Sequence, residues 1–180
     1  MKLFIKTILI ILFTLNFARS EILKIGIDPD YFPFAQIIPA KLSIYNACAY
    51  GNNSPGFKEC NKKHLPYKGA DIDLALYLCN RMEVQCEFIH KDFNRLIPEL
   101  KDAKFDVIVS AMSIKPERQI EIDFSIPYFV FSDGSATGIG IRKNRNALKV
   151  KINNTLSEAI NNEVIKKISM RYWKEDFTPK

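Results

Sequence analysis

The sequence predicts an α/β fold with a parallel sheet, and three observations support this prediction. Segments with strand-like alternation are separated by segments with helical spacing of apolar residues. A strand–helix–strand–helix–strand order is typical of parallel βαβ units with right-handed crossovers. A chain of 180 residues is also long enough to bury one stable core.

Residues 1–20 are expected to be a signal peptide. Lysines precede an uncharged, mostly apolar run at 7–17, and small residues precede an expected cleavage before Glu21. The alternative is a membrane anchor, but this run is shorter than the roughly 20 residues that span a bilayer. Cleavage would lower the formal net charge from +6 to +3, because three basic and no acidic residues would be lost.

The first part of the chain after Glu21 combines a strand, a long loop and a helix. The segment 22–28 alternates and is β-branched, which predicts a strand, and the prolines that follow end it. Residues 37–69 are polar and contain Gly, Pro and Asn, so they are expected to form an insertion. Apolar residues with helical spacing predict a helix over 70–82.

The middle of the chain repeats this order. A strand is expected at 84–90, and Asp92 is a suitable N-cap for a helix over 93–103, which Pro98 is expected to bend or interrupt. A third strand is expected at 105–111.

The last elements are a short helix over 116–122 with proline at its first position, a fourth strand over 135–143, and two closing helices over 148–160 and 163–173.

Four cysteines remain after the expected cleavage: Cys48, Cys60, Cys79 and Cys86. An even number of cysteines in a secreted chain favours disulfides, and four cysteines allow three pairings. We favour the local pairing Cys48–Cys60 and Cys79–Cys86, which closes two short loops. Zinc is the alternative, but the spacing contains no CxxC pair and the two histidines do not complete a ligand pattern, so no metal site is predicted.

The positive charge is mild and scattered, which favours a solvated surface over a nucleic-acid interface, so no nucleic-acid partner is expected.

In a parallel sheet, ligands bind at the carboxyl ends of the strands. The segment "SAMSIKPER" ends the third strand and opens a helix, whose N-terminal N–H groups suit an anion. Ser110 and Ser113 add hydroxyl groups, and Arg118 can bind a carboxylate through two N–H groups. These residues would suit an α-carboxylate. The alternative is a serine N-cap and an arginine that faces solvent.

The turn after the first strand, "DPDYFPF", contains Asp28 and an aromatic cluster. Asp28 beside Tyr31 would hold a cationic group by its charge and by the face of the ring. The alternative is an Asx-turn at Asp28, with Tyr31 and Phe34 in the core.

Several of these segments resemble bacterial solute-binding protein family 3, the polar and basic amino-acid receptors of ABC importers. The resemblance is carried by "IGIDPDYFPF", "KGADIDLALYLCNRM", "GIGIRKN", "EVIKKISMRYW" and, most specifically, "FNRLIPELKDAKFDVIVSAMSIKPERQIEIDFSIPYF". It covers most of the chain after residue 20. It implies lobe one of a type II periplasmic binding protein fold.

The resemblance also implies roles for the residues of the two turns. Arg118 would bind the α-carboxylate of an amino acid, with Ser110 and Ser113 beside it. Tyr31 would pack on the aliphatic stem of the ligand, and Asp28 would face a distal ammonium or guanidinium group.

The chain also matches and departs from the family at other positions. The spacing of Cys79 and Cys86 matches a disulfide of the lysine/arginine/ornithine and histidine binders, whereas Lys115 replaces a usual threonine cap. The insertion at 37–69 is not typical. The family has a second lobe between "SIPYF" and "GIGIRKN", and only "VFSDGSAT" stands there, so the second lobe is absent. The expected single lobe is 21–129 plus a C-terminal return at 135–180.

The function expected from the resemblance is that of a periplasmic component of an ABC transporter, which binds a free polar or basic amino acid and meets a membrane permease. No cofactor is expected. Loss of the second lobe would leave the ligand exposed and binding near millimolar. One alternative is a degenerate or repurposed lobe without ligand. Another is a dehydratase-like enzyme, for which no nucleophile–base pair is present in the sequence and no catalytic residue is predicted.

Overall fold

The centre of the molecule is a mixed sheet with strand order β5-β1-β6-β10-β7. The computed structural model describes residues 21–38 and 66–180. The strands of this sheet are β1 (Ile22–Ile27), β5 (Gln85–His90), β6 (Val107–Ile108), β7 (Asp123–Phe124) and β10 (Gly140–Ile141). Both neighbours of β1, β5 and β6, run parallel to it, which confirms the predicted βαβ core. β10 runs antiparallel to β6 and β7.

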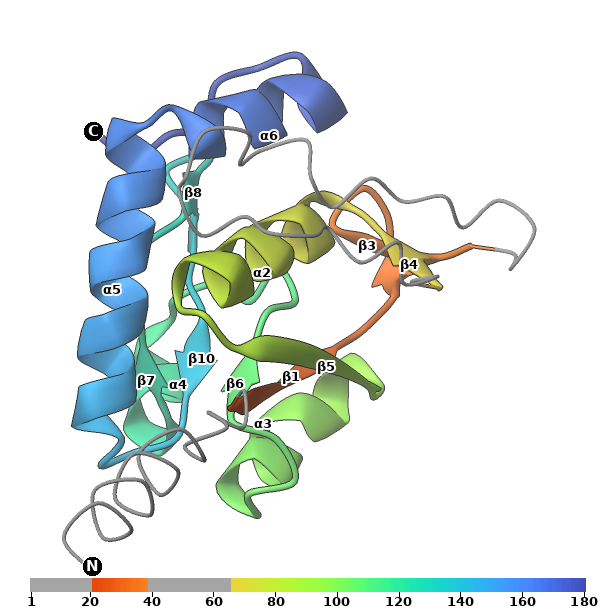
Figure 1. Cartoon of the computed structure of the whole chain (residues 1–180), viewed down its shortest axis with the longest axis vertical. Helices are drawn as coiled ribbons and strands as arrows, with labels where there is room; N and C mark the ends of the chain where they lie inside the picture. Colours follow the sequence, from red (N-terminus) through yellow and green to blue (C-terminus); the bar gives the residue numbers. More distant parts are fainter. Residues whose placement is uncertain (1–20, 39–65) are drawn as a thin grey trace, which may run out of the picture.

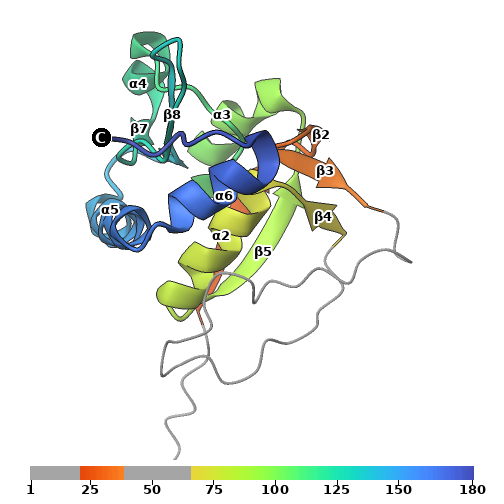
Figure 2. The same ribbon diagram turned by 90° about the horizontal axis from the view of Figure 1, so that it is seen from above.

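Helices cover both faces of this sheet. Within the described residues they are α2 (Ala70–Arg81), α3 (Phe93–Lys101), α4 (Pro116–Glu121), α5 (Asn146–Asn161) and α6 (Val164–Trp173). Figure 1 shows α2 and α3 on opposite sides of β1 and β5, and in Figure 2 α6 and α2 lie over the same part of the sheet. None of the helices in this part of the chain is long and apolar enough to cross a membrane.

Alternation along β1 separates the core into two clusters. Ile25 and Ile27 are buried in the cluster shared with α2, α5 and α6. Gly26 lies between them and faces the other side, where a Cβ atom would come within 2.6 Å of the Phe105 ring. Phe105 belongs to the second cluster, together with Leu96 of α3. The sheet is therefore buried on both faces, as parallel sheets usually are.

The strand predicted over 135–143 is divided between two sheets. Its first part forms β9 (Ala136–Thr137), which pairs with β8 (Phe129–Val130) in a hairpin, and its second part is β10 of the main sheet. Phe131 closes the hairpin by donating its N–H to the Ser135 carbonyl. The short segment 130–137, where the resemblance implies that a second lobe is missing, therefore closes as a turn. The strand predicted over 105–111 is also shorter, since only β6 joins the ladder.

A second, small sheet has the order β2 (Asp30–Tyr31), β3 (Ala35–Ile37) and β4 (Tyr67–Lys68). β3 and β4 pair antiparallel, so the segment expected to be an insertion leaves and returns at neighbouring strands. Its residues 39–65, with the predicted Cys48–Cys60 pair, lie outside the described residues, as does the expected signal peptide at 1–20.

Helix α3 departs from two predictions. Asp92 stands at the N-cap position but makes no side-chain cap hydrogen bond. The Phe93 N–H instead donates to the carboxylate of Asp28, 3.1 Å away, so a residue from another turn takes the capping role. Pro98 does not interrupt the helix, which continues to Lys101. Proline lacks only the N–H donor, which costs the helix one hydrogen bond. The Pro98 carbonyl still accepts the Asp102 N–H, so the helical pattern resumes after the proline.

The disulfide Cys79–Cys86 is present, as the local pairing predicts. It joins the last part of α2 to β5 over a sequence separation of 7 residues. The covalent link therefore lies on the same βαβ unit that carries the first strand.

Candidate functional site

The carboxyl ends of β1 and β6 bring the two predicted turns together. The strands pair in parallel register, with Gly26 opposite Ile108. Two residues later, the Asp28 N–H donates to the Ser110 Oγ at 2.9 Å. Ser110 is buried, so this hydrogen bond joins the turns from inside the lobe. The adjacency expected from the parallel sheet is therefore present.

Asp28 forms the Asx-turn that was the alternative interpretation of its position. Its Oδ1 accepts the Asp30 N–H and its Oδ2 accepts the Phe93 N–H, both at 3.1 Å. Each oxygen of an ionised carboxylate has a further lone pair, so these bonds fix the group without exhausting its acceptor capacity. Asp28 is thus a carboxylate held in one orientation by the backbone of two elements.

Tyr31 is exposed at the surface of this turn, with 58% of its area accessible. Its ring stacks on Phe34 with the centroids 5.2 Å apart. Phe34 is buried and contacts Trp173 at 5.0 Å between centroids. The alternative interpretation, with both aromatic residues in the core, therefore holds only for Phe34, while Tyr31 is an exposed ring that stacks on it.

Arg118 lies on α4, and its side chain contacts Ser113 and Phe93. One guanidinium nitrogen donates to the Ser113 carbonyl at 3.0 Å, and the guanidinium carbon lies 5.2 Å from the centre of the Phe93 ring. In the described part of the chain, Arg118 takes part in none of the ion pairs. A guanidinium group has five N–H donors, so most of them are left for a carboxylate.

Phe93 is a site residue that sequence reasoning missed. Its backbone N–H donates to the Asp28 carboxylate and its ring makes a cation–π contact with Arg118, so Phe93 contacts both candidate charges. Phe93 is 37% exposed, so a ligand can reach it. The only signal in the sequence is an aromatic residue directly after an expected N-cap, which is too common to indicate a site.

Behind the turn of Ser110 lies a buried carboxylate, Asp71, at the start of α2. It accepts the Ala111 N–H at 2.6 Å and the Tyr128 hydroxyl at 2.9 Å. Burial raises the pKa of Asp71 to about 7, although both hydrogen bonds act to lower it. The candidate turn is therefore fixed from inside by a group that titrates near neutral pH.

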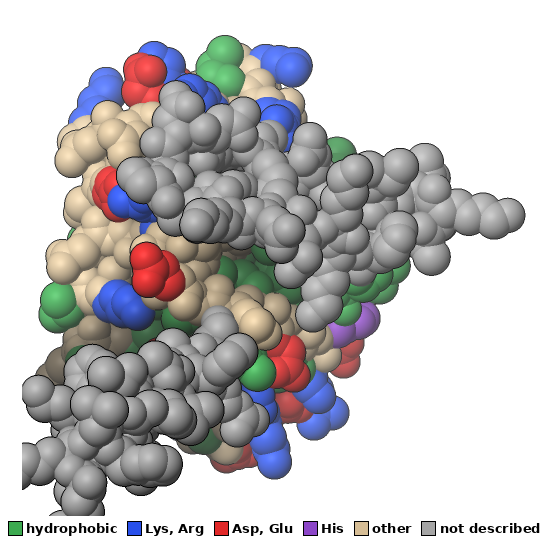
Figure 3. Space-filling view, in the orientation of Figure 1, with side chains coloured by type: hydrophobic (Ala, Val, Ile, Leu, Met, Phe, Trp, Pro, Cys, Tyr) green, Lys and Arg blue, Asp and Glu red, His purple; other side chains and the backbone are tan. Residues whose placement is uncertain are grey.

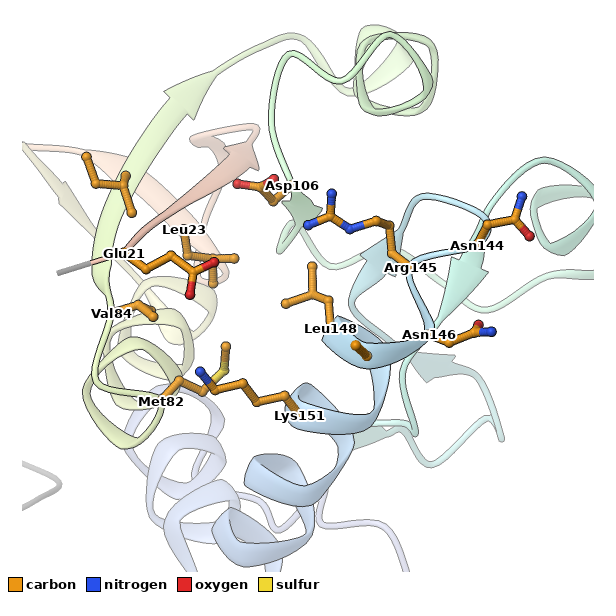
Figure 4. Close-up of a pocket in the computed structure, with 12 residues that line it drawn as sticks. Glu21, Leu23, Met82, Val84, Asp106, Asn144, Arg145, Asn146, Leu148 and Lys151 are labelled. Atoms are coloured by element: carbon orange, nitrogen blue, oxygen red, sulfur yellow. The ribbon is translucent and has the colours of Figure 1, made fainter. Parts of the chain in front are cut away.

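The candidate residues lie on an open face of the lobe. A cavity of about 670 Å³ adjoins Ser113 and is otherwise lined mainly by the segment around β7 and by the hairpin turn, with Lys115, Lys143 and Lys149 among its residues. A second cavity, of about 480 Å³, lies at the opposite end of β1, between Leu23 and the first turn of α5 (Figure 4). Asp28, Tyr31, Ser110 and Arg118 line neither of these two cavities.

Charges of both signs are mixed on the face of the lobe shown in Figure 3. Within residues 21–38 and 66–180, no group of three or more His, Cys, Asp or Glu side chains is placed to hold a metal ion. The candidate residues described above therefore offer the guanidinium of Arg118, the fixed carboxylate of Asp28 and the exposed rings of Tyr31 and Phe93.

Comparison with known proteins points to one family. The family model described as "Bacterial extracellular solute-binding proteins, family 3" matches residues 47–175. The ABC transporter arginine-binding protein 1 of Escherichia coli (strain K12) is 32% identical over 129 residues, which are 72% of this chain and 43% of that protein. The lysine/arginine/ornithine-binding periplasmic protein of the same organism is 38% identical over 108 residues, 60% of this chain and 32% of that protein. The chain thus spans less than half of the length of these relatives.

Solved structures with the same fold include a single lobe. The arginine-bound form of domain 1 from TmArgBP, in its Phe57Trp mutant, is 28% identical, with a TM-score of 0.61 over 78% of this chain and 92% of that one. An ancestral arginine-binding protein bound to glutamine has a TM-score of 0.67 at 19% identity, a likeness that concerns the fold alone.

Proposed function

This chain belongs to family 3 of the bacterial extracellular solute-binding proteins, and on that premise we propose that it binds a free polar or basic amino acid on its open face. The observation that carries the proposal is the arginine-bound domain 1 of TmArgBP, a single lobe of this fold that holds arginine. Arginine is accordingly the first ligand to test. The curated relatives are binding proteins, and we propose no enzymatic activity.

The proposed roles follow the two turns. Arg118 binds the α-carboxylate, because its guanidinium keeps unused donors and is oriented by Ser113 and the Phe93 ring. Asp28 faces the cationic end of the ligand, with its carboxylate already held by two backbone N–H groups.

Ser110 and Ser113 shape the turn beneath the carboxylate of the ligand. Tyr31 offers an exposed ring face to its aliphatic stem.

The proposed affinity is low. On an open face, the pair between Arg118 and a ligand carboxylate remains in contact with water, and exposed pairs contribute about 0–1 kcal/mol. Without a second lobe to exclude water, we expect a binding free energy of roughly −4 kcal/mol, which corresponds to a dissociation constant near millimolar.

NMR titration of the purified protein with arginine, lysine, histidine and glutamine tests this proposal. We expect shifts that saturate at millimolar arginine, and loss of saturation in Arg118→Ala. Arg95→Ala is the matched control, because Arg95 is an exposed arginine on α3 that pairs with Glu99 outside the site. Absence of saturable shifts for every amino acid would overturn the proposal and favour a lobe without ligand.

We further propose that the chain is exported through residues 1–20 to the periplasm and meets an ABC permease there. The relatives are periplasmic, which supports this location. Fractionation of a bacterial culture that expresses the full chain should recover a periplasmic form that begins at Glu21. A form that keeps residues 1–20 would contradict the export proposal.

The low affinity and the single lobe also predict that the chain alone does not support uptake. Growth of an arginine auxotroph that expresses the chain with a permease tests this, and uptake without any second binding protein would contradict it.

A further inference from the structure

The turn at the candidate site contains a strained residue. Ala111, which follows Ser110, has a φ of 46°, in the left-handed region. A residue with a Cβ atom is disfavoured there by roughly 1–2 kcal/mol. The conformation therefore persists only because contacts around Ala111 impose it.

Asp71 supplies one of these contacts from the sheet-facing helix α2. Its Oδ2 lies 2.6 Å from the Ala111 nitrogen, and its Oδ1 accepts the Tyr128 hydroxyl. The backbone that carries this side chain is fixed as well, since the Asp71 N–H donates to the Phe34 carbonyl at 2.9 Å. The side chain of Asp71 is fully buried, which strengthens its hydrogen bonds.

The opposite side of the turn is fixed by the strand that returns from the hairpin. The Gly138 N–H donates to the Met112 carbonyl at 3.1 Å, and the Ile114 N–H donates to the Ala136 carbonyl at 2.9 Å. These bonds fix the residues after Ala111. Ala111 itself is held by the 2.6 Å hydrogen bond from its N–H to Asp71, with the Tyr128 hydroxyl beside the same N–H.

We propose that Asp71 is a positioning residue of the amino-acid site, which holds Ala111 in the left-handed conformation and so sets the path of the chain from Ser110 to Ser113. It does not touch the ligand. The inference rests on the proposed function for its effect on binding, but its effect on the turn is independent of any ligand.

Protonation of Asp71 is expected to change its hydrogen bond with the Ala111 N–H, and so to alter the conformation of the turn. An ionised carboxylate accepts both hydrogen bonds, whereas a protonated one must donate its own hydrogen, and only the Tyr128 oxygen can accept it. The other titratable group nearby on α2 is Asp73, whose carboxylate faces Arg171 and Tyr172 of α6. Burial raises the pKa of Asp73 to about 7 as well, but Asp71 is the carboxylate that bonds the Ala111 N–H, so loss of the Ala111 titration in Asp71→Asn is what assigns it to Asp71.

The first test substitutes Asp71 in two ways. Asp71→Leu removes the acceptor, and we expect arginine binding to weaken about tenfold and hydrogen exchange of the Ala111 amide to accelerate by a similar factor. Asp71→Asn keeps an oxygen for the Ala111 N–H and offers an NH₂ group to the Tyr128 oxygen, so binding should stay within about threefold of the wild type. Unchanged affinity and exchange in Asp71→Leu would overturn the proposal.

The matched background is Ala111→Gly, which adopts a positive φ without strain. In this background, Asp71→Leu should raise the logarithm of the dissociation constant by less than half as much as it does in the wild type. Equal losses in both backgrounds would show that Asp71 acts on something other than the conformation of Ala111, and would overturn the proposal.

A ligand-free measurement separates this inference from the proposed function. The ¹H–¹⁵N resonance of Ala111 should titrate near pH 7 in the wild type and remain flat in Asp71→Asn, whether or not any amino acid binds. Tyr128→Phe removes a hydrogen bond that lowers the pKa of Asp71, so the midpoint should move upward. An Ala111 resonance that still titrates in Asp71→Asn would contradict the inference, and this result is available even if Asp71→Leu does not fold.

Discussion

Gly69, the residue directly before α2, allows a quantitative test of how the motif "KGADIDL" fixes the site. Its φ is 142°, and a Cβ atom would lie 2.1 Å from the Phe34 carbonyl oxygen. Gly134, in the hairpin, also has a positive φ, 81°, but a Cβ atom there would meet nothing within 4 Å. The two glycines thus share a positive φ and differ in the space around them.

The expected effects of alanine follow from this difference. Gly134→Ala adds strain alone and should lower the free energy of unfolding by about 1 kcal/mol. Gly69→Ala adds strain in a region almost restricted to glycine, and also a clash with backbone that cannot move aside, so we expect a loss of about 3–5 kcal/mol. Phe34 is buried and packs on Trp173, which prevents the carbonyl from retreating.

Urea unfolding followed by tryptophan fluorescence measures both effects, because the single Trp173 lies in the aromatic cluster beside Phe34. Equal m-values would show that the two variants unfold from the same native state. If Gly69→Ala and Gly134→Ala were destabilised equally, within about 0.5 kcal/mol, the reasoning from crowding would be refuted.

Three further predictions concern charge, the disulfide and specificity. Because burial raises the pKa of Asp71 to about 7, the folded state binds more protons than the unfolded state between about pH 4 and 7. Asp71 alone should then lower the unfolding free energy by about 4 kcal/mol as pH rises through this window. Asp73, whose pKa burial also raises to about 7, adds a fall that Asp71→Asn keeps, so urea midpoints that fall equally in Asp71→Asn and in the wild type would contradict the prediction. Replacing Cys79 and Cys86 by alanine should lower stability by roughly 2–3 kcal/mol in equilibrium unfolding, and a peptide map that joins either to another cysteine would refute the pairing. Asp28→Asn should weaken binding of lysine but not of glutamine in NMR titrations, whereas Arg118→Ala should weaken both by about 1 kcal/mol, the upper end for an exposed pair. Equal loss for both ligands in Asp28→Asn would exclude Asp28 as the specificity residue.

The order of the elements could be predicted because it depends on local patterns. The β-branched alternation of 22–28 and the helical spacing of 70–82 each appear within one segment, and both elements formed. The prediction of one strand over 135–143 was less accurate. The whole segment has the same strand-like pattern, but its two halves pair with different strands. β9 pairs with β8 and β10 with β6, and no local pattern encodes that division.

The site was predictable to the extent that topology determines it. Asp28 and Ser110 were expected to meet because they follow parallel strands, and they share a hydrogen bond. The contact of Asp71 with Ala111 was not predictable, since the two residues are 40 positions apart and the spacing of a helix does not show what its first turn faces. The capping of α3 by Asp28 was missed for the same reason, since Asp92 offered a local alternative that the structure does not use.

The way the two turns are held bears on what a single lobe can do. Backbone N–H groups of its own lobe orient Asp28, and Ser113 and Phe93 orient Arg118. Both side chains are therefore positioned without a ligand or a second lobe. A ligand therefore loses little binding energy to ordering of the site. The low affinity expected for a ligand on this face arises instead from water, because water screens each charge pair. A second lobe that closed over the ligand would remove this screening. Enclosure, and not further contacts with these residues, is then what would distinguish millimolar from micromolar binding.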